Sequence, residues 1–576
     1  MRSTPKTSPR VPGWVAAVAA LAFGALLVGW VATHLPRPPI GPRFVGAGSE
    51  TPNPGGTFIF AESSNIHTMD PAFAYDTLST AACRLLYDAL LDYDYDGNFI
   101  PSLAKDLPEI SDEGRVFRFE LRKGVKFHNG RELVAEDVSW TMHRLLSERL
   151  GSPGYPFYKS IVGAQAYHNG QVDRVEGIVV IDDYTIEFRL TEPDQTFLNA
   201  LAMPFASPLP REHVEAWEAA EGVTAVGRHP VGTGPFALKR WERGVQVEFD
   251  RFDDYWNPRP RVAHMVFLEN ISPDVASARF RNGGLDILYR PSKVNRLFFR
   301  ESEAWAPFVT EVPSAGLFAL TLNCELPPLD NVHVRRAIAY AVDRSKIERL
   351  DPGSVIPATQ ILPPTLPPYD PELPQGQRYD LEDAKEEMRL AGYPNGLPEP
   401  IEMWVRTDGE ALYGQLFQQD LKAIGIDLEL KTVTFATYLK EAGRPRVVPM
   451  AFSGWHQDFP DASNFMDILF HSRSIHPENS ENRAFYRNPK LDKILDRGRA
   501  EIDRAKRLEL YAEANAILAT DAPWVFLFYP VELFVWQPYV KNFRPHPVWL
   551  NEYRNVWLDL PRRRVSQDRY AEEATP

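Results

Sequence analysis

Strand-like and helix-like patterns follow one another along this chain, and their succession restricts the possible folds more than any other feature. Phe117, Phe119 and Leu121 alternate with charged residues, as expected of a half-buried strand. The segment 178–190 shows the same alternation on both sides of an Asp-Asp pair, which predicts a hairpin. A further strand is expected at 245–249. The sequence up to about residue 250 therefore predicts several half-buried strands.

Helical patterns dominate the second half of the chain. Asn331 is expected to cap a helix with one apolar face, and Asp380 to cap a second helix over 381–391. A third helical pattern over 412–424 is followed by strand-like alternation over 426–430. Helices and strands in succession predict an α/β fold with mixed sheets and two lobes.

The size and charge of the chain exclude some classes of protein. At 576 residues it exceeds what one hydrophobic core supports, so two or three domains, or one large bilobed structure, are expected. A formal net charge of −14, without a large basic stripe, argues against a nucleic-acid partner. Cys83 and Cys324 are the two cysteines; they either form a disulfide in an exported protein or remain small buried thiols.

The first 36 residues predict the compartment. Residues 11–36 contain no Asp, Glu, Lys or Arg, and a helix over 14–35 would be about 33 Å long, enough to cross a hydrocarbon core. The alternative is a signal peptide, whose apolar core is usually only about 7 to 15 residues, cleaved near 45–47. We expect the rest of the chain on the periplasmic side, anchored to the cytoplasmic membrane by that helix or secreted if it is cleaved.

A dense group of polar side chains follows an apolar run over 447–452, which itself predicts a buried strand. The stretch 454–465, GWHQDFPDASNF, contains His456, Asp458 and Asp461. Acid or base catalysis by the two carboxylates would require a reactive partner, and no H-E-x-x-H or G-x-S-x-G motif occurs in the chain. A metal or haem site would have only two histidines, twenty residues apart, and is the less favoured alternative. Asp458 is left either as a turn-capping residue or as the partner of a positive charge outside the chain.

Five blocks of sequence carry a resemblance to a known family. They are MDPAFAYDTLSTAACRLLYDALL at 69–91, FRFELRKGVKFHNGRELVAEDV at 117–138, HPVGTGPFALKRW at 229–241 with YW at 255–256, LNCELPPLDNVHVRRAIAYAVDR at 322–344, and the stretch 454–465. In this order the chain resembles the extracytoplasmic solute-binding proteins of peptide-class ABC importers, solute-binding protein family 5. The resemblance extends from about Gly55 to about Leu558.

The resemblance implies a bilobed, periplasmic-binding-protein-like type II fold of three domains that closes on its ligand about a hinge. The expected segments are an anchor or signal at 1–35, a Pro/Gly-rich linker at 36–56, domain I at 57–100, 229–315 and 531–560, domain II at 101–228, domain III at 316–530, and a polar tail at 561–576. Domain II would be inserted into domain I, and the cleft would lie between domains I and III.

The resemblance also implies a function. The chain is expected to be a monomeric peptide-binding subunit that delivers peptides to ABC permease and ATPase subunits, without enzymatic activity and without a cofactor. Two alternatives stay open. One is a receptor of the same fold for another solute, such as a metal chelate, haem, glutathione or an oligosaccharide. The other is a membrane-tethered sensor or scaffold.

The ligand-binding residues expected from the resemblance fall into three groups. Asp458 would bind the terminal ammonium of a peptide through a charge-assisted hydrogen bond. Arg406 would pair with the terminal carboxylate, although it does not fall at the position used by dipeptide receptors, so strict dipeptide specificity is not expected. The remaining candidates are backbone groups at Tyr75, Asp76, Thr77, Gly454, Trp455 and His456, which would add the peptide as a strand, and the pocket-lining side chains of Phe318, Trp404 and Tyr413.

Overall fold

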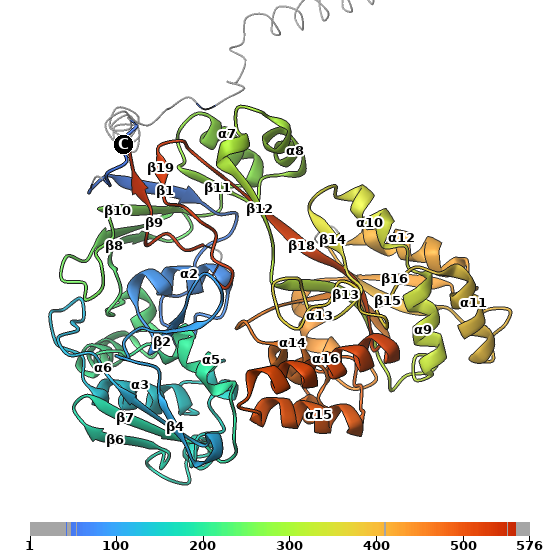
Figure 1. Ribbon diagram of the computed structural model, residues 1–576, viewed down its shortest axis with the longest axis horizontal. Coiled ribbons are helices and arrows are strands. Elements are labelled where there is room, and N and C mark those ends of the chain that lie inside the picture. The colour runs from blue at the N-terminus through green and yellow to red at the C-terminus, as the bar shows by residue number, and fades with distance from the viewer. Residues whose placement is uncertain (1–41, 43–47, 53, 408–409, 550, 560–576) are drawn as a thin grey trace, which may run out of the picture.

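The computed structural model describes residues 42, 48–52, 54–407, 410–549 and 551–559. Two lobes lie side by side and are joined by crossing strands (Figure 1). The segments predicted at 1–35 and 561–576 lie outside the described residues. Within the described part, no helix combines the length and apolar character needed to span a bilayer.

The first lobe contains two four-stranded sheets. One has the order β1-β10-β9-β8, with β1 parallel to β10 and the other pairs antiparallel; the other has the order β4-β5-β7-β6 and is antiparallel throughout. Their strands are β1 (Thr57–Ala61), β8 (Phe236–Glu242), β9 (Gln246–Arg251), β10 (His264–Leu268), β4 (Glu109–Ser111), β5 (Val116–Glu120), β6 (Ile178–Asp182) and β7 (Thr185–Arg189).

Helices and short strands complete the first lobe around these sheets (Figure 1). The helices are α2 (Thr77–Leu86), α3 (Ala135–Leu146), α4 (Ala164–His168), α5 (Phe197–Ala202), α6 (Arg211–Glu221), α7 (Pro273–Arg281) and α8 (Lys293–Glu301). The short strands are β2 (Leu91–Tyr93), β3 (Phe99–Pro101), β11 (Ile287–Tyr289), β19 (Val540–Lys541) and β20 (Trp557–Leu558).

The second lobe is built on the remaining large sheet, in which β13, β17, β15 and β16 are neighbours in that order. Its strands are β13 (Gly316–Leu322), β14 (Val355–Pro357), β15 (Ile401–Arg406), β16 (Leu428–Val433) and β17 (Met450–His456). Its helices are α9 (Val332–Ala341), α10 (Arg344–Leu350), α11 (Leu381–Leu390), α12 (Ala411–Lys422), α13 (Phe435–Ala442), α14 (Ala462–Phe470), α15 (Pro489–Ala500) and α16 (Arg504–Asp521).

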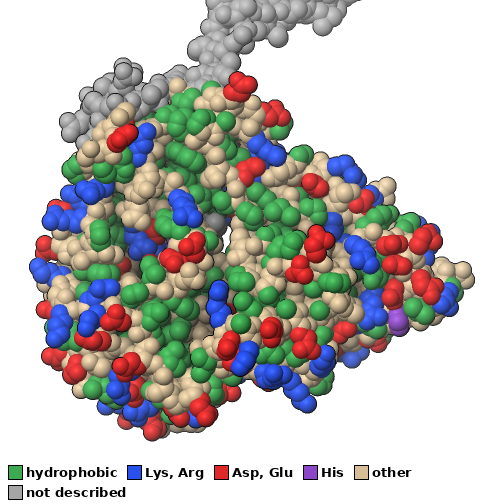
Figure 2. All heavy atoms as spheres, viewed as in Figure 1, with side chains coloured by type: hydrophobic (Ala, Val, Ile, Leu, Met, Phe, Trp, Pro, Cys, Tyr) green, Lys and Arg blue, Asp and Glu red, His purple; other side chains and the backbone are tan. Residues whose placement is uncertain are grey.

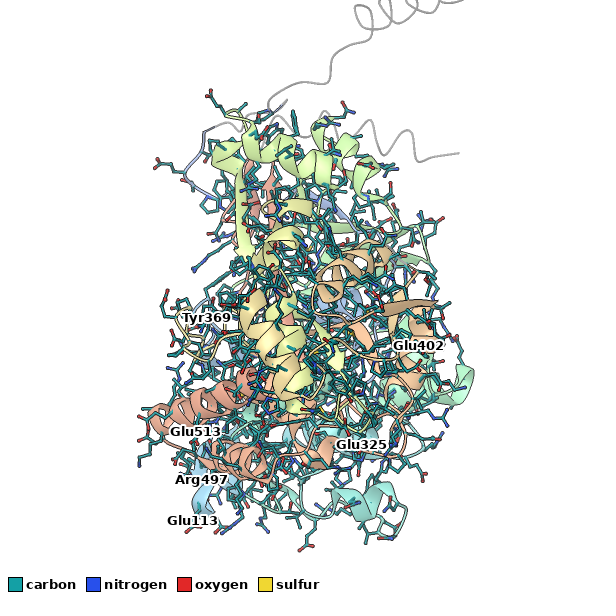
Figure 3. All side chains as sticks on the ribbon, turned by 90° about the vertical axis from the view of Figure 1, so that its right-hand side faces the viewer. Glu113, Glu325, Tyr369, Glu402, Arg497 and Glu513 are labelled. Atoms are coloured by element: carbon teal, nitrogen blue, oxygen red, sulfur yellow. The ribbon has the colours of Figure 1, made fainter. Side chains whose placement is uncertain are left out.

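Figure 3 looks onto the outer side of the second lobe. Glu513 on α16 and Arg497 on α15 are exposed there. These two helices pack against each other and, through their inner faces, cover a core that includes Leu491, Leu495 and Leu518. The charged outer face and the apolar inner face are those of ordinary amphipathic helices.

Two strands carry the chain between the lobes. β12 (Val309–Pro313) leads directly into β13, and the 13-residue β18 (Trp524–Trp536) pairs first with β13 and then with β12 and β11. Each crossing strand has a proline near the crossing point, Pro313 and Pro530. Because proline has no N–H to donate, the backbone ladder is weaker at this place than on either side.

The sequence-based expectations for most elements are confirmed. The hairpin at 178–190 is formed by β6 and β7, and Asn331 and Asp380 cap α9 and α11 through their side chains. The strand expected at 447–452 is wrong in its limits. It is observed as Met450–His456, because the strand continues along β13 into the polar stretch.

Asp286 connects parts of the first lobe that are far apart in the sequence. Its carboxylate is fully buried and accepts hydrogen bonds from the Ile59 amide of β1 at 2.6 Å and from the Tyr539 hydroxyl at 2.8 Å. Its own amide donates to the Ile59 carbonyl at 2.9 Å. One carboxylate thus joins the first strand, the segment before β11 and the C-terminal return.

We expect Asp286→Ala to lower the free energy of unfolding by about 3 kcal/mol, because two buried donors lose this acceptor. Urea titration followed by circular dichroism measures the change. Asp253→Ala is the matched control: Asp253 is 66% exposed and pairs with Arg251, so its loss should cost less than about 1 kcal/mol. Equal effects of the two substitutions would contradict the structural role of Asp286.

Candidate functional site

A cavity of about 320 Å³ lies between the lobes, beside the crossing strands. Figure 2 shows the gap that separates the two halves of the molecule. Cavities of larger volume, up to about 630 Å³, lie on the first lobe, and no residue of the second lobe lines them. The first lobe contributes Tyr75, Asp76, Thr77, Thr80, Arg84, Met203, Phe205, Arg290 and Trp549 to the cavity wall, the crossing contributes Ser314 and Ala315, and the second lobe contributes His456, Gln457 and Asp458.

The structure brings together five of the eleven site residues expected from the sequence. Tyr75, Asp76, Thr77, His456 and Asp458 line the cavity, although their two groups are separated by almost four hundred residues of sequence. The other six expected residues do not line it; they are Phe318, Trp404, Arg406, Tyr413, Gly454 and Trp455. The Tyr413 ring is stacked on Phe452 and its hydroxyl donates to Asp351.

Asn464 on α14 fixes the position of Asp458. This asparagine is fully buried, and its side-chain oxygen accepts from the Asp458 amide at 3.0 Å and from the Trp455 indole at 2.9 Å. Its amide nitrogen donates to the Asp458 carboxylate at 2.9 Å. Trp455 therefore supports the site from behind the carboxylate.

No lysine or arginine in the described part of the chain forms an ion pair with the Asp458 carboxylate. Burial raises its pKa to about 6, although hydrogen bonds from Asn464 and Tyr75 act in the opposite direction, and Glu481 adds to the rise. Among the described residues, no lysine or arginine contributes to lowering this pKa. The carboxylate is therefore ionised at neutral pH, and no cation among the described residues offsets the free-energy cost of desolvating its charge.

Asp461, three residues later, shows the opposite behaviour. It caps α14 by accepting from the Ser463 amide at 2.9 Å, and it forms a two-point ion pair with Arg507 at 2.5 and 2.7 Å. Although burial acts to raise its pKa, Arg507 holds that pKa below the usual range. The same short stretch thus contains one neutralised carboxylate and one without a partner charge.

The lobes touch each other across the cavity at Tyr75. Burial and the nearby Asp458 carboxylate raise the pKa of its hydroxyl, and its ring contacts Phe205 with a centroid separation of 5.6 Å. The neighbouring Asp76 caps α2 by accepting from the Leu78 and Ser79 amides. The Asp76 side chain is therefore used inside the protein, and only backbone atoms of this segment are available to pair with a strand.

Contacts also join the lobes at the far end of the gap. Arg499 on α15 bonds to Glu192 at 2.6 Å, and its carbonyl accepts from the Gln195 amide at 3.0 Å. The rings of Phe157 and Phe459 lie 6.4 Å apart, and Phe459 belongs to the core of the first lobe. The two lobes are thus in contact at both ends of the cavity.

Two glycines near the site make room for the protein's own side chains. A Cβ on Gly454 would lie 3.0 Å from the Phe318 ring, and one on Gly316 would lie 2.6 Å from the His456 ring. The Phe318 ring by itself explains why position 454 is a glycine. The expectation that Gly454 lets a ligand backbone come close stays a prediction. Phe318 is stacked 4.9 Å from Phe528 and forms part of the second lobe's core edge.

Arg406 and Trp404 on β15 lie outside the cavity wall. Arg406 forms an ion pair with Glu410 and its guanidinium carbon lies 5.1 Å from the centre of the Phe435 ring. Trp404 is buried and donates to Glu402 at 2.6 Å. The role of Arg406 in binding a peptide carboxylate stays a prediction that this geometry does not support.

Several lining residues have no local signal in the sequence. Arg84 and Trp549 stack with 4.1 Å between the guanidinium carbon and the ring centre, although they come from opposite ends of the described chain. Gln457 and Asn464 lie within the polar stretch 454–465, so the sequence alone could have identified them as candidates. In contrast, Arg84, Arg290 and Trp549 are placed only by the tertiary fold.

Metal and disulfide alternatives find no counterpart in the described residues. That part of the chain contains no group of three or more His, Cys, Asp or Glu residues able to hold a metal ion. Cys83 is buried, Cys324 is partly buried, and both are free. Burial raises the pKa of both thiols, as expected of small apolar side chains rather than reactive ones.

Comparison with known proteins identifies the family. The model of the bacterial extracellular solute-binding proteins, family 5 Middle, matches residues 98–476. The chain belongs to this family. It is a family of binding proteins, which confirms the prediction that the chain is not an enzyme.

Relatives of family 5 match almost the whole chain. The dipeptide-binding protein of Escherichia coli K12 is 27% identical over 524 residues, which cover 87% of this chain and 95% of the relative. The heme-binding protein A of Haemophilus influenzae is 28% identical, and the match covers 87% of this chain and 92% of the relative. A periplasmic binding protein of Helicobacter pylori, solved in complex with the peptide STSA, superposes with a TM-score of 0.74 at 27% identity, covering 88% of this chain and 99% of its own. The α/β periplasmic-binding-protein fold expected from the sequence is confirmed.

The charge state of Asp458 leads to a prediction on stability. A carboxyl whose folded pKa is raised to about 6 destabilises the folded state at higher pH, and the penalty disappears as pH falls towards the unfolded pKa. Asp458→Asn should therefore raise the free energy of unfolding of the ligand-free protein by about 2 kcal/mol at pH 7.5, with a smaller gain at pH 5. Urea titrations at several pH values measure this.

Asp461→Asn is the matched control with the opposite expected sign. It breaks the ion pair with Arg507 and should destabilise the protein by about 3 kcal/mol at pH 7.5. A gain for Asp458→Asn that does not change with pH would contradict the electrostatic explanation.

Proposed function

We propose that this chain is the peptide-binding subunit of an ABC importer. It takes a peptide into the cavity between the lobes and delivers it to permease and ATPase subunits. The observation that carries this proposal is Asp458, a carboxylate placed between the lobes with no cation of its own among the described residues. The names of several relatives, which are dipeptide-binding and di/tripeptide-binding proteins, support it.

The terminal ammonium of a peptide supplies the positive charge that Asp458 lacks. A charge-assisted hydrogen bond of this kind contributes about 1.5–3 kcal/mol net. Because Asn464 already orients the carboxylate, little ordering of the Asp458 side chain accompanies binding. The ammonium also lowers the pKa of Asp458, so peptide binding near pH 6 should release a proton.

The end of β17 is available for a strand from the ligand. Among the described residues, β15 pairs with β17 only at Met450 and Ala451, so residues 453–456 extend beyond it while still pairing with β13 on their other side. A peptide laid along this edge would bond through its backbone, whatever its side chains are. Backbone atoms of 75–77 would face it from the first lobe.

Closure about the crossing strands is part of the proposal. The two prolines weaken the ladder at the crossing, and the contacts of Arg499 and Phe459 with the first lobe favour the closed arrangement. We further propose that the chain acts on the periplasmic side as a monomer of three domains. Residues 14–35 would anchor it to the cytoplasmic membrane.

The ammonium contact is tested with paired peptides. Isothermal titration calorimetry on ligand-stripped protein should show that N-acetylation, or Asp458→Asn, weakens binding of a free-amine peptide about 100-fold, because a buried charge pair loses one member. Asp106→Asn, at an exposed aspartate outside the cavity, is the control and should leave affinity unchanged. Equal affinity of acetylated and free peptides would overturn the assignment of Asp458.

Closure is tested at the far contact between the lobes. Arg499→Met removes the bond to Glu192, which is worth about 1 kcal/mol, and should speed release of bound peptide about fivefold in stopped-flow fluorescence. Arg497→Met, on the same helix but on the outer surface shown in Figure 3, is the control. If both variants release peptide at the wild-type rate, this contact does not stabilise the closed form.

A further inference from the structure

We infer that the cavity recognises only the amine end of its ligand, and that the ligand's terminal carboxylate is not a recognition element. The inference rests on the proposed function and specifies the class of peptide that the same site accepts. It follows from the balance of charges along the cavity wall, taken one cation at a time.

Arg290 is the first of two arginines that line the cavity. Its guanidinium forms a two-point ion pair with Glu532, with distances of 2.8 Å from Nε and 2.5 Å from Nη2. Glu532 is 5% exposed, whereas the Arg290 side chain is 49% exposed, so the carboxylate is the buried member of the pair. A ligand carboxylate that took Nε and Nη2 would leave Glu532 buried without its cation, and one that bonded to Nη1 would share a guanidinium whose charge Glu532 already offsets.

Arg84 is the second lining arginine, and it belongs to a balanced cluster. Its Nη2 donates to Asp92 at 3.1 Å and to Glu552 at 3.0 Å. Arg554 bonds to the same two carboxylates at 2.8 and 2.7 Å. Two guanidinium groups thus face two carboxylates, and the cluster carries no surplus positive charge for a ligand.

His456 adds no positive charge to the wall. Although part of the His456 surface is exposed, desolvation of its ring between the lobes lowers its pKa to about 4; Arg290 acts in the same direction and Glu532 opposes it, so the imidazole is neutral at pH 7. Among the described residues that line the cavity, Arg84 and Arg290 are the only lysines or arginines. No lining cation is therefore left to offset the desolvation of a ligand carboxylate.

The charge that stays unbalanced on the wall is the negative charge of Asp458. Among the described residues Asp458 has no countercharge, whereas the polar atoms that are buried without a hydrogen-bond partner are of both kinds: the Gln457 oxygen, the Ser314 hydroxyl and Arg84 Nε. Ser314 is fully buried at the crossing. This charge favours a ligand that brings a positive charge and disfavours one that brings a carboxylate.

The ligand class that fits is a peptide with a free N-terminus whose carboxyl end is amidated or extends from the cavity into solvent. A ligand with two carboxylates fits this wall poorly for the same reason. Free-acid and amidated forms of one peptide should therefore bind with similar affinity. In a site with an arginine reserved for the terminal carboxylate, the amide would bind far more weakly.

The experiment compares four forms of one tripeptide and of one pentapeptide: free acid or amide at the C-terminus, and free amine or acetyl at the N-terminus. Calorimetry with the wild-type protein should give amide and acid dissociation constants within about threefold of each other. Acetylation should weaken binding about 100-fold in both series. Measurements at about 0.15 M and 0.5 M salt control for the change in net charge that amidation brings, since long-range attraction to a chain of net charge −14 is screened by salt.

The possible outcomes separate the two claims. A loss of more than about tenfold on amidation, present at both salt concentrations, overturns the inference while leaving peptide binding intact. Binding of neither the tripeptide nor the pentapeptide in any form overturns the proposed function, and the inference falls with it. Similar constants for acid and amide, together with the loss on acetylation, support both.

Discussion

The two lobes depend on one strand, β18, which is part of the hydrophobic core of each. Val525 and Leu527 are buried in the second lobe, whereas Leu533 and Val535 are buried in the first. Its backbone bonds to β13 at one end and to β12 and β11 at the other. β18 is thus packed into both cores. We expect the lobes to change their relative orientation near Pro530, where the hydrogen-bond ladder of this strand is weaker, and the cavity lies beside that position.

The chemistry of the cavity follows from the contrast between two nearby carboxylates. Asp461 is neutralised by Arg507 and serves the fold as the cap of α14. Asp458 is held in place by the neutral Asn464 and lacks a cation, so it destabilises the ligand-free protein. A group of this kind is retained at a cost in stability when a binding site needs it.

Local patterns in the sequence predicted the elements that depend on near neighbours. The hairpin at 178–190 and the helix caps Asn331 and Asp380 were predicted because alternation and capping act over a few residues. The limits of β17 were predicted wrongly, because its last residues are strand only through pairing with β13. The glycine at 454 likewise reflects the Phe318 ring, which no local pattern reveals.

The sequence by itself determined the α/β class, the family, and the candidacy of Asp458 within its polar stretch. Only the tertiary structure decided which charges remain unbalanced. Arg84 and Arg290 both line the cavity, yet each is paired with an acidic residue from the C-terminal part of the chain. The physical reason is that a charge is balanced by whatever lies within a few ångströms in space, and sequence separation places no limit on that distance.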